Sequence, residues 1–470
     1  MTDDLAFTPA TELVAGYRDR TLSPVDVTGA LLDRIETLNP ALNAYRLIDR
    51  EGALAASRAS QARWAKGAPQ GRVDGVPVSI KDLVLTRGLS TLRGSRTVDP
   101  AGDWTEDAPA VARLRAEGAV ILGKTATCEF GWKGVTDSPL TGITRNPWNL
   151  ERTPGGSSGG AAAAVAAGLG PLAIGSDGGG SIRIPAGFTG TFGIKASFGR
   201  VASYPPSPFG TLSHVGPMTR TVADAALMLS VIAGSDPTDW LSLPDAGTDW
   251  RDGIEGGVAG LRVAFSADLG YARVAPDVAR RVAAAAALFE DLGAVVEAVD
   301  PDIADPLECF RVHWYAGAAN LLRDADDARR RLIEPGLIEI ADTGAGYSGL
   351  DLTAAANFRA DFAVRLGRFH ERYDLLLTPA LPLTAFTAGL EVPEGSGLGR
   401  WFEWSPFSLP FNLTGQPAAS VPCGFGDDGL PVGLQIVGRR HDDGLVLRAA
   451  RALETARPWA ARRPPIAATT

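Results

Sequence analysis

Residues 153–195 have the sequence TPGGSSGGAAAAVAAGLGPLAIGSDGGGSIRIPAGFTGTFGIK and set two serines, Ser157 and Ser181, among glycines. Residues 159–167 are rich in alanine, the strongest helix former, and predict a helix that opens just after the first serine. The apolar run 171–174 predicts a short buried strand that leads into the glycine turn before Ser181. Glycines beside a serine let the backbone approach a ligand closely. The stretch therefore predicts an ordered site around two serine hydroxyls.

A flexible Gly/Ser linker would have the same local composition as GGSSGG. A linker separates segments of different composition, whereas apolar sequence continues here on both sides of Ser181. We therefore assign the stretch to the folded core. Its consecutive glycines, Gly178, Gly179 and Gly180, can direct their N–H groups together at a developing negative charge.

The composition is that of a globular protein with a substantial core: 470 residues, 45% of them hydrophobic and 21% charged. The formal net charge of −9 disfavours binding to nucleic acid or to an anionic membrane surface. The three cysteines are widely spaced and form no CxxC pair, so reduced thiols are expected. The N-terminus lacks the pattern of a secretory signal, and a cytoplasmic protein without membrane spans is expected.

Strand and helix patterns alternate along most of the chain and predict the α/β class. Near the N-terminus, Ser23 is a typical N-cap, and Asn39-Pro40 is expected to end the helix that follows. Strands are expected at 76–80, 119–122, 261–265, 294–299, 374–378, 419–421 and 432–437, and helices at 51–66, 108–117, 221–232, 276–292 and 445–456. From 301 to 369 the pattern is mainly helical without a linker, which indicates a helical excursion of one domain.

Two motif matches do not fit their local sequence, and a lone cysteine lacks the surroundings of a nucleophile. Residues 118–125, GAVILGKT, match the phosphate-loop pattern GxxxxGK[ST], but the four intervening residues are an apolar strand rather than a loop. Residues 155–159 match the GxSxG elbow of α/β-hydrolases, but the preceding RNPWNLERTP is not the buried strand that an elbow needs. Cys128 has no base nearby in sequence that would make its thiol a nucleophile.

The remaining arrangement pairs the two serines with a lysine. Val76, Val78 and Ile80 share one face of the expected strand, so Ser79 and Lys81 lie on the other. On its own, Lys81 would be a solvated lysine at a strand end, and it becomes a base near neutral pH only if burial favours its neutral form. A serine hydroxyl between lysine and nucleophile can accept one proton while it donates another. This chemistry needs no histidine, which suits a chain that has only four, none of them in residues 153–195.

Several motifs together resemble the amidase signature enzymes, and the resemblance covers most of the chain. They are GVPVSIKD (75–82), the GK turn at 123, TPGGSSGG (153–160), GSDGGGSIRIPA (175–186), GPMTRTVAD (216–224), PFNLTGQPA (410–418) and GLPVGLQIVG (429–438). The two active serines of that family are 24 positions apart, as Ser157 and Ser181 are here, which selects Ser157 rather than Ser158. The resemblance implies one α/β domain over residues 1–470, with a central mixed β-sheet flanked by helices, a signature region at 75–228 and a helical excursion at 301–370.

The resemblance also implies a mechanism. Ser181 is expected to attack the carbonyl carbon, and Ser157, which should follow a cis peptide bond from Gly156, to relay the proton to Lys81 as the base. Ser157 then returns a proton to the departing amine, because an amide anion leaves poorly. Water resolves the acyl-enzyme, and neither a metal nor a cofactor is implied.

Further residues are expected to support these three. Asp177 and Arg183 flank the glycine turn and are expected to hold it, and Ser158 is expected to support Lys81 or the turn by hydrogen bonding. The oxyanion hole is expected to consist of the N–H groups of Gly178, Gly179, Gly180 and Ser181.

The substrate pocket is predicted from aromatic residues and from one departure from the family pattern. Trp401 and Phe402 follow a Gly- and Glu-rich loop at 389–399, so we favour an apolar substrate wall over core packing for them. Cys128 stands where relatives often carry proline and is expected to border the site, together with Trp132. The resulting prediction is a serine amidohydrolase for apolar or aryl amides, with carbamates and esters also considered.

The alternative is the glutaminase subunit of a tRNA-dependent amidotransferase, which releases ammonia from glutamine. The acidic net charge counts against direct contact with tRNA, although a partner protein could supply it. For the amidohydrolase we expect a small-molecule substrate, no nucleic acid, no membrane, and a monomer or homodimer.

Overall fold

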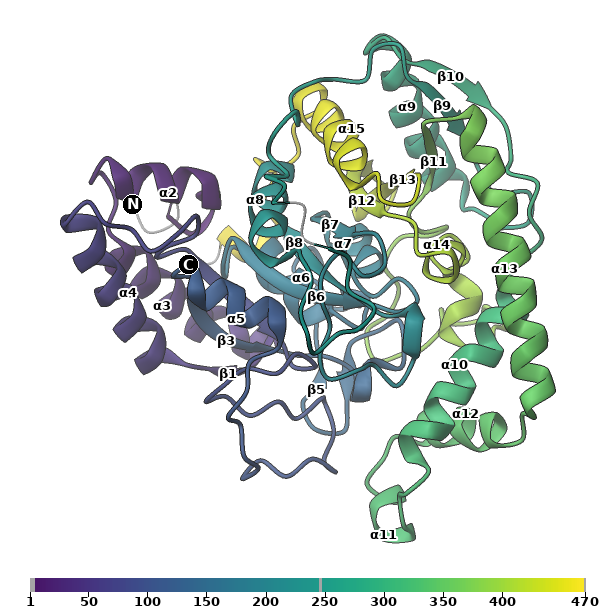
Figure 1. Cartoon of the computed structure of the whole chain (residues 1–470), viewed down its shortest axis with the longest axis horizontal. Helices are drawn as coiled ribbons and strands as arrows, with labels where there is room; N and C mark the ends of the chain where they lie inside the picture. Colours follow the sequence, from purple (N-terminus) through teal and green to yellow (C-terminus); the bar gives the residue numbers. More distant parts are fainter. Residues whose placement is uncertain (1–4, 245–246, 469–470) are drawn as a thin grey trace.

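A mixed sheet of eleven strands runs through the part of the chain that the computed structural model describes, residues 5–244 and 247–468 (Figure 1). The strand order is β1-β3-β2-β6-β8-β7-β12-β13-β11-β9-β10. Strand β2 pairs in parallel with β3 and β6, and β9 with β10 and β11, whereas the pairs between β6 and β11 are antiparallel. The predicted α/β fold with a central mixed sheet is confirmed.

The strands of this sheet are β1 (Tyr45–Ile48), β2 (Pro77–Lys81), β3 (Val120–Thr125), β6 (Leu172–Asp177), β7 (Phe192–Lys195), β8 (His214–Thr219), β9 (Arg262–Phe265), β10 (Val295–Ala298), β11 (Leu375–Pro379), β12 (Ala418–Phe425) and β13 (Pro431–Gly438). A separate hairpin pairs β4 (Asp137–Ser138) with β5 (Gly142–Ile143). The α-helices are α2 (Ala10–Arg18), α3 (Pro24–Leu42), α4 (Arg50–Ala65), α5 (Pro109–Ala116), α6 (Gly159–Ala166), α7 (Arg183–Thr189), α8 (Val222–Ile232), α9 (Pro276–Asp291), α10 (Leu307–Leu322), α11 (Asp327–Arg330), α12 (Pro335–Ala345), α13 (Gly349–Arg372), α14 (Leu409–Thr414) and α15 (Asp443–Ala456).

Helices cover both faces of the sheet, and this decides where Lys81 points. Helices α5, α8, α9 and α15 pack on one face, in a core that includes Val78 and Ile80 of β2. Helices α6 and α7 pack on the other face, against Ala173 and Met218. Because successive side chains of a strand alternate between faces, Ser79 and Lys81 point toward the α6 side, as the sequence pattern predicts.

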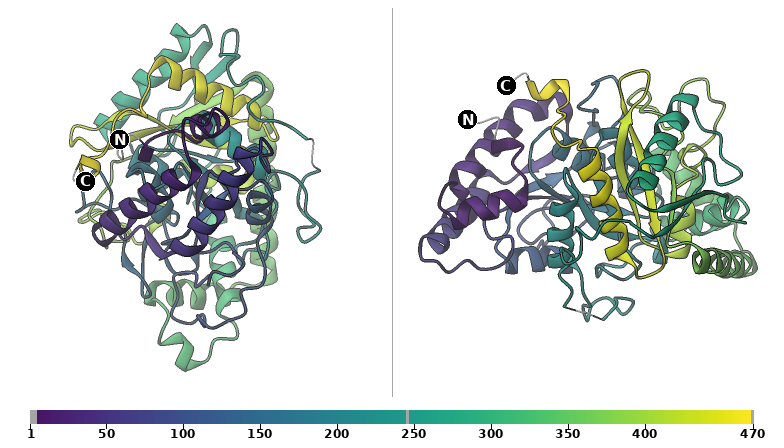
Figure 2. Two further views of the ribbon diagram at one scale, coloured as in Figure 1. Left: turned by 90° about the vertical axis from the view of Figure 1, so that its left-hand side faces the viewer. Right: turned by 90° about the horizontal axis from the view of Figure 1, so that it is seen from above.

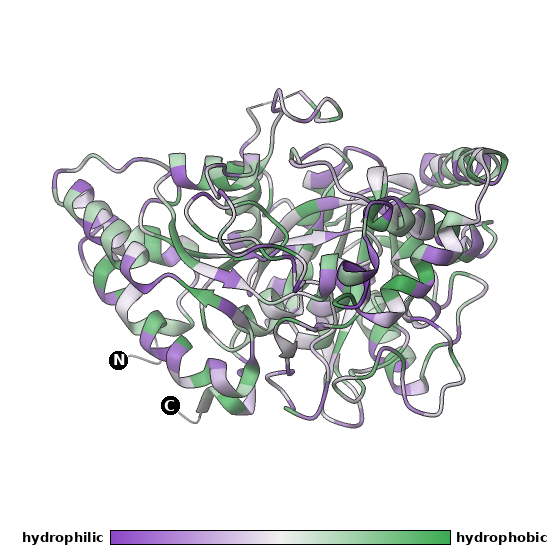
Figure 3. Ribbon diagram, turned by 90° about the horizontal axis from the view of Figure 1, so that it is seen from below, coloured by the Kyte–Doolittle hydropathy of each residue, from purple (hydrophilic) through white to green (hydrophobic). Residues whose placement is uncertain are grey.

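Most of the remaining helices lie toward the two ends of the sheet. Helices α2, α3 and α4 lie beside β1 and β3 at one end, and α13 lies at the opposite end, with α10 and α12 beside it (Figures 1 and 2). In Figure 3, the peripheral helices carry apolar and polar residues along their length, as expected for helices that pack one side against the core. No helix among the described residues combines the length and apolar character that crossing a bilayer requires.

Helix α3 continues beyond the point at which the sequence was expected to end it. It runs through Pro40 to Leu42, and Asn43 ends it in the left-handed conformation, with φ 51°. The side-chain oxygen of Asn39 accepts hydrogen bonds from the N–H groups of Ala44 and Tyr45, at 2.9 and 2.7 Å. Proline removes only one backbone donor, and a side-chain acceptor satisfies the turn that follows.

The apparent phosphate loop is a buried strand. Residues Val120–Thr125 form β3, and all six are buried. Lys124 donates to the hydroxyls of Thr86 and Thr91, at 2.9 and 2.8 Å, and therefore supports the local structure. The interpretation of GAVILGKT as an accidental match is confirmed.

Gly160 in α6 offers a test of how closely this helix packs on the sheet. A Cβ at Gly160 would lie 2.5 to 2.6 Å from backbone atoms of Ala126 and Ala44, none of which can rotate away. Gly160→Ala should therefore destabilise the protein by about 1–3 kcal/mol. A drop in the thermal unfolding midpoint measures the effect.

Gly29→Ala is the matched control, since Gly29 lies in α3 and a Cβ there meets nothing within 4 Å. Removing this glycine should stabilise the protein by about 0.4–1 kcal/mol. Equal midpoints for the two variants would contradict the tight packing of α6.

Candidate active site

Lys81 is the last residue of β2, and its side chain is fully buried. Its Nζ lies 2.7 Å from Ser157 Oγ, 2.8 Å from Ser158 Oγ and 2.9 Å from Ser176 Oγ. The two serines of the GGSSGG segment thus meet the strand-end lysine, although they are far apart from it in sequence. Lys81 is therefore not the solvated lysine that it would be in isolation.

Burial makes Lys81 suitable as a base. Desolvation lowers its pKa to about 7, although nearby Cys128 and Asp177 partly oppose the shift. The protonated amine has three N–H groups for the three hydroxyl oxygens, and the neutral amine has two N–H groups and a lone pair. The lone pair can accept the proton of Ser157, so the same three contacts serve both protonation states.

Ser158 and Ser176 support this arrangement through hydrogen bonds to each other. The Ser158 hydroxyl donates to the Ser176 carbonyl at 3.1 Å and accepts from the Ser176 N–H at 3.2 Å. Ser158 also donates its own N–H to the carbonyl of Ser181, at 3.2 Å. Ser158 thus supports both Lys81 and the turn that carries Ser181, the two roles that the sequence left open.

Ser176 is a site residue that sequence reasoning missed. It lies near the end of β6, one residue before Asp177, and its hydroxyl contacts Lys81. A serine in a strand has no pattern of its own, and only the pairing of β2 with β6 brings it to Lys81. Its place inside GSDGGGS, directly before the glycine turn, is the signal that could have indicated it.

Ser157 and Ser181 lie on the two segments that meet at this turn. The peptide bond between Gly156 and Ser157 is cis, as the resemblance implies. Ser181 is buried, with 3% of its surface exposed, and its hydroxyl makes no hydrogen bond with a described residue. The direct contact between the two serine hydroxyls that a proton relay needs is therefore not formed in this structure, and catalytic hydrogen bonds often tighten only when substrate binds.

An ion pair inside the protein holds the glycine turn. Asp177 accepts from Arg183 Nε at 3.0 Å and from Nη2 at 2.9 Å, and both residues are fully buried. Arg183 also donates to the side chains of Gln435 and Asn412, at 2.9 and 2.6 Å. Burial alone would raise the pKa of Asp177, but the charge and hydrogen bonds of Arg183, together with Lys195 and Asn412, outweigh it and hold the pKa well below the usual range.

The same carboxylate corrects the predicted oxyanion hole. The N–H of Gly180 donates to Asp177 Oδ1 at 2.8 Å and is not available to a substrate. The N–H groups of Gly178, Gly179 and Ser181 make no hydrogen bond with a described residue. The geometry therefore leaves three backbone donors rather than four for a developing oxyanion.

The four predicted pocket residues lie in the core around the turn. A Cβ on Gly179 would lie 2.6 Å from the Trp401 ring, so that ring packs directly against the turn. Phe402 is 3% exposed and contacts Trp401, so both rings are packed in the core beside the turn, and their assignment to a substrate wall stays a prediction. Trp132 is buried and donates to Glu334 at 2.8 Å. Burial raises the pKa of the Cys128 thiol to about 12, so it is not a nucleophile.

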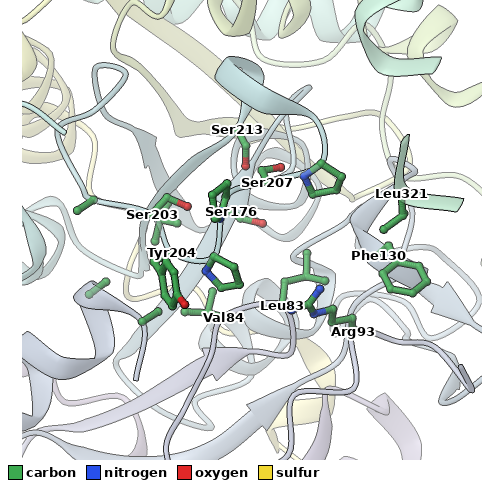
Figure 4. Close-up of a pocket in the computed structure, with 17 residues that line it drawn as sticks. Leu83, Val84, Arg93, Phe130, Ser176, Ser203, Tyr204, Ser207, Ser213 and Leu321 are labelled. Atoms are coloured by element: carbon green, nitrogen blue, oxygen red, sulfur yellow. The ribbon is translucent and has the colours of Figure 1, made fainter. Parts of the chain in front are cut away.

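A cavity of about 100 Å³ opens instead beside Ser176 (Figure 4). Its apolar lining includes Leu83, Val84, Phe130, Leu321 and the prolines of residues 205–208, and Ser203 and Ser207 add hydroxyl groups. Sequence reasoning missed these residues because they come from four segments without a common motif. Since Ser176 contacts both the cavity and Lys81, a substrate arm in the cavity would lie beside the base.

Comparisons with known proteins agree with this geometry. The Amidase family model matches residues 26–447. An acylamidase of Rhodococcus erythropolis is 40% identical over 98% of both chains, and a glutamyl-tRNA(Gln) amidotransferase subunit from Roseiflexus castenholzii is 36% identical over 95% of both. Among solved structures, a bacterial aryl acylamidase of the amidase signature enzymes superposes with a TM-score of 0.91 at 33% identity, covering 99% of each chain.

The pKa of Lys81 predicts how amide hydrolysis depends on pH. Below about pH 7 Lys81 is protonated and cannot accept a proton, so kcat/KM should fall about tenfold per pH unit on the acid side. Lys81→Ala should lower kcat by about 10²–10⁴-fold and remove this acid limb from the residual activity. Steady-state kinetics between pH 5 and about 9 measure both effects.

Lys124→Met is the matched control, because burial also lowers the pKa of Lys124 to about 7 while its contacts lie elsewhere. Its acid limb should stay where the wild type has it. Loss of that limb in Lys124→Met would show that Lys81 is not the group that titrates.

The ion pair under the turn predicts a large effect on stability. Asp177→Asn leaves the buried Arg183 without its counter-charge, which typically costs about 3–5 kcal/mol. The thermal midpoint and kcat should both fall, because the turn also presents the oxyanion donors. Asp427→Asn breaks an exposed pair with Arg280 and should cost at most about 1 kcal/mol. Equal midpoints in the two variants would contradict the structural role of Asp177.

Proposed function

The chain belongs to the amidase signature family and is a hydrolase of amide C–N bonds, and on this premise we propose that it cleaves amides of apolar or aryl compounds through an acyl-enzyme on Ser181. The observation that carries the mechanism is the buried Lys81, with its Nζ 2.7 Å from Ser157 Oγ. A lysine with a pKa near 7 in contact with a serine hydroxyl is able to drive such a relay without a histidine.

In the first half of the proposed reaction, Ser181 Oγ attacks the carbonyl carbon. Its proton passes to Ser157 Oγ, while the proton of Ser157 passes to the lone pair of Lys81. The carbonyl oxygen becomes an oxyanion that accepts hydrogen bonds from the N–H groups of Gly178, Gly179 and Ser181. Removal of one such donor typically costs about 10²–10³-fold in rate.

The second half returns the protons. Ser157 donates a proton to the departing amine and regains one from the Lys81 ammonium, so the C–N bond breaks without release of an amide anion. Water then attacks the ester on Ser181, and its proton follows the same route. The carboxylic acid product leaves, and Ser181 recovers its proton.

The substrate class is supported by the cavity beside Ser176, which Leu83, Val84, Phe130 and Leu321 make apolar. The acylamidase and aryl acylamidase relatives are similar over nearly the whole chain and favour the same class. Aryl carbamates and esters have the same reacting carbonyl and belong to the proposal. We propose a cytoplasmic monomer or homodimer that acts on a small molecule, with neither a nucleic acid nor a membrane as partner.

The second candidate is the glutaminase subunit of a tRNA-dependent amidotransferase. The similarity to the glutamyl-tRNA(Gln) amidotransferase chain, at 36% identity, favours it. It requires a partner protein that uses the ammonia, and the net charge of −9 disfavours direct contact of this chain with tRNA. Ammonia release from L-glutamine, together with co-purification of a second chain, would support this candidate.

A fluorophosphonate probe tests the proposed nucleophile. We expect one adduct, on Ser181, with labelling slowed at least about 10²-fold in Lys81→Ala, because the base is lost. Ser181→Ala should abolish labelling, and Ser396→Ala, in an exposed loop, should leave it as in the wild type. Peptide mass spectrometry locates the adduct, and an adduct on Ser157 would overturn the assignment.

The same preparations test the substrate class. The wild type should hydrolyse short-chain acyl anilides with a kcat/KM above that for L-glutamine. The release of the aniline measures the rate. Faster turnover of L-glutamine than of every anilide would overturn the proposed substrate class and favour the amidotransferase candidate.

A further inference from the structure

Arg93 is the only charged residue among those that line the cavity beside Ser176. In Figure 4 its guanidinium lies beside Leu83 and near Phe130, at the lower side of the cavity. The rest of the lining is apolar or carries hydroxyl groups. A single cation in such a chamber is a specific chemical feature that the proton relay does not use.

The Arg93 guanidinium makes no hydrogen bond and no ion pair with the residues that the structure describes. The charge that most influences it is that of Asp82, whose carboxylate is already paired with Arg46 Nε at 2.7 Å. Burial lowers the pKa of Arg93, but a guanidinium stays charged in proteins. A half-buried cation without a partner is costly, so its place in a ligand cavity calls for an anion there.

The backbone at Arg93 is fixed relative to the reacting groups. Its N–H donates to the carbonyl of Asp82, the residue after Lys81, at 3.0 Å. Its carbonyl accepts from the N–H of Phe130 at 2.7 Å, and its φ of 56° lies in the left-handed region. Gly94 follows where a Cβ would lie 2.7 Å from the carbonyl oxygen of Thr127. The guanidinium therefore starts from an anchored position close to the end of β2.

Ser176 is the residue that the cavity shares with the reacting centre. Ser176 lines the cavity with Arg93, and its hydroxyl lies 2.9 Å from Lys81 Nζ. A substrate whose carbonyl lies at Ser181 can therefore extend a short arm past Ser176 toward Arg93. An apolar cavity of about 150 Å³ can hold benzene. The cavity here, at about 100 Å³, admits a smaller group.

We propose that Arg93 binds a carboxylate carried by the substrate, so that this enzyme prefers amides with a short acidic arm over neutral amides of equal length. The planar guanidinium fork matches the two oxygens of a carboxylate. Leu83 and Phe130 pack against the methylene groups that connect the acid to the scissile amide. The proposal rests on the proposed amidase function and narrows its substrates.

Matched pairs of amides test this preference. One pair is glutaryl and pentanoyl 4-nitroanilide, with the acid on the acyl side, and the other is N-butyryl-β-alanine and N-propylbutanamide, with the acid on the amine side. In the wild type, kcat/KM should favour the acidic member of at least one pair. In Arg93→Gln that preference should fall by about 10–100-fold, mainly through KM, because a hydrogen bond to a charged group is lost.

Two further variants separate recognition from folding. Arg93→Lys keeps the charge without the planar fork and should restore part of the preference. Arg96→Gln removes a nearby exposed arginine that does not line the cavity and should leave the preference as in the wild type. A loss in Arg93→Gln that is equal for acidic and neutral members would indicate a structural role and overturn the proposal.

Binding of glutarate, measured by calorimetry, distinguishes this proposal from the proposed function. Glutarate should bind the wild type and Ser181→Ala alike, and at least about tenfold more weakly to Arg93→Gln. If the wild type binds glutarate through Arg93 but hydrolyses none of the amides, the carboxylate site stands and the amidase proposal fails. If neutral amides are hydrolysed but neither an acid preference nor glutarate binding depends on Arg93, the carboxylate site fails alone.

Discussion

The burial of one lysine amine among three serine hydroxyls is the constraint on which the site depends. A charged amine in the protein interior is unfavourable, and burial without a counter-charge in contact moves the pKa of Lys81 to about 7. The hydroxyls of Ser157, Ser158 and Ser176 satisfy the amine in either protonation state without fixing it as an ammonium. A carboxylate in their place would stabilise the charge and remove the base.

This constraint explains how the surrounding fold is arranged. Lys81 reaches the serines only because β2 is central, buried on both faces, and parallel to β6. The strand presents Val78 and Ile80 to the α5, α8 and α15 side and Lys81 to the α6 side. Helix α6 approaches so closely that glycine is needed at Gly160. Arg183 forms an ion pair with the Asp177 carboxylate and so holds it at the glycine turn.

The sequence was sufficient for the fold class and for the residues that local motifs carry. The alternating patterns predicted the α/β class, and the family resemblance of the motifs implied the mixed sheet and brought Lys81, Ser157 and Ser158 into one site. Ser176 was missed, although it lies within the GSDGGGS motif, because only the pairing of β2 with β6 brings it to Lys81. The N–H of Gly180 was misassigned because the competing acceptor is the side chain of Asp177.

The extent to which a side chain is buried was the other property that the sequence could not supply. Trp401 follows a glycine-rich loop, which suggested exposure to substrate, yet contacts with Phe310, Trp314 and Phe402 make it part of the core. The end of α3 was placed too early because the acceptor on Asn39 satisfies the backbone that Pro40 disturbs.

The cavity and the relay come largely from different parts of the chain. Most of the cavity wall comes from residues 202–208, Phe130 and Leu321 of α10, whereas the relay belongs to β2, β6 and the start of α6. Ser176 is the lining residue that contacts Lys81 directly. Substitutions in that wall can therefore change which molecules enter while the proton chemistry is inherited intact. The enzyme is built so that natural selection, or a protein engineer, can alter specificity and catalysis one at a time.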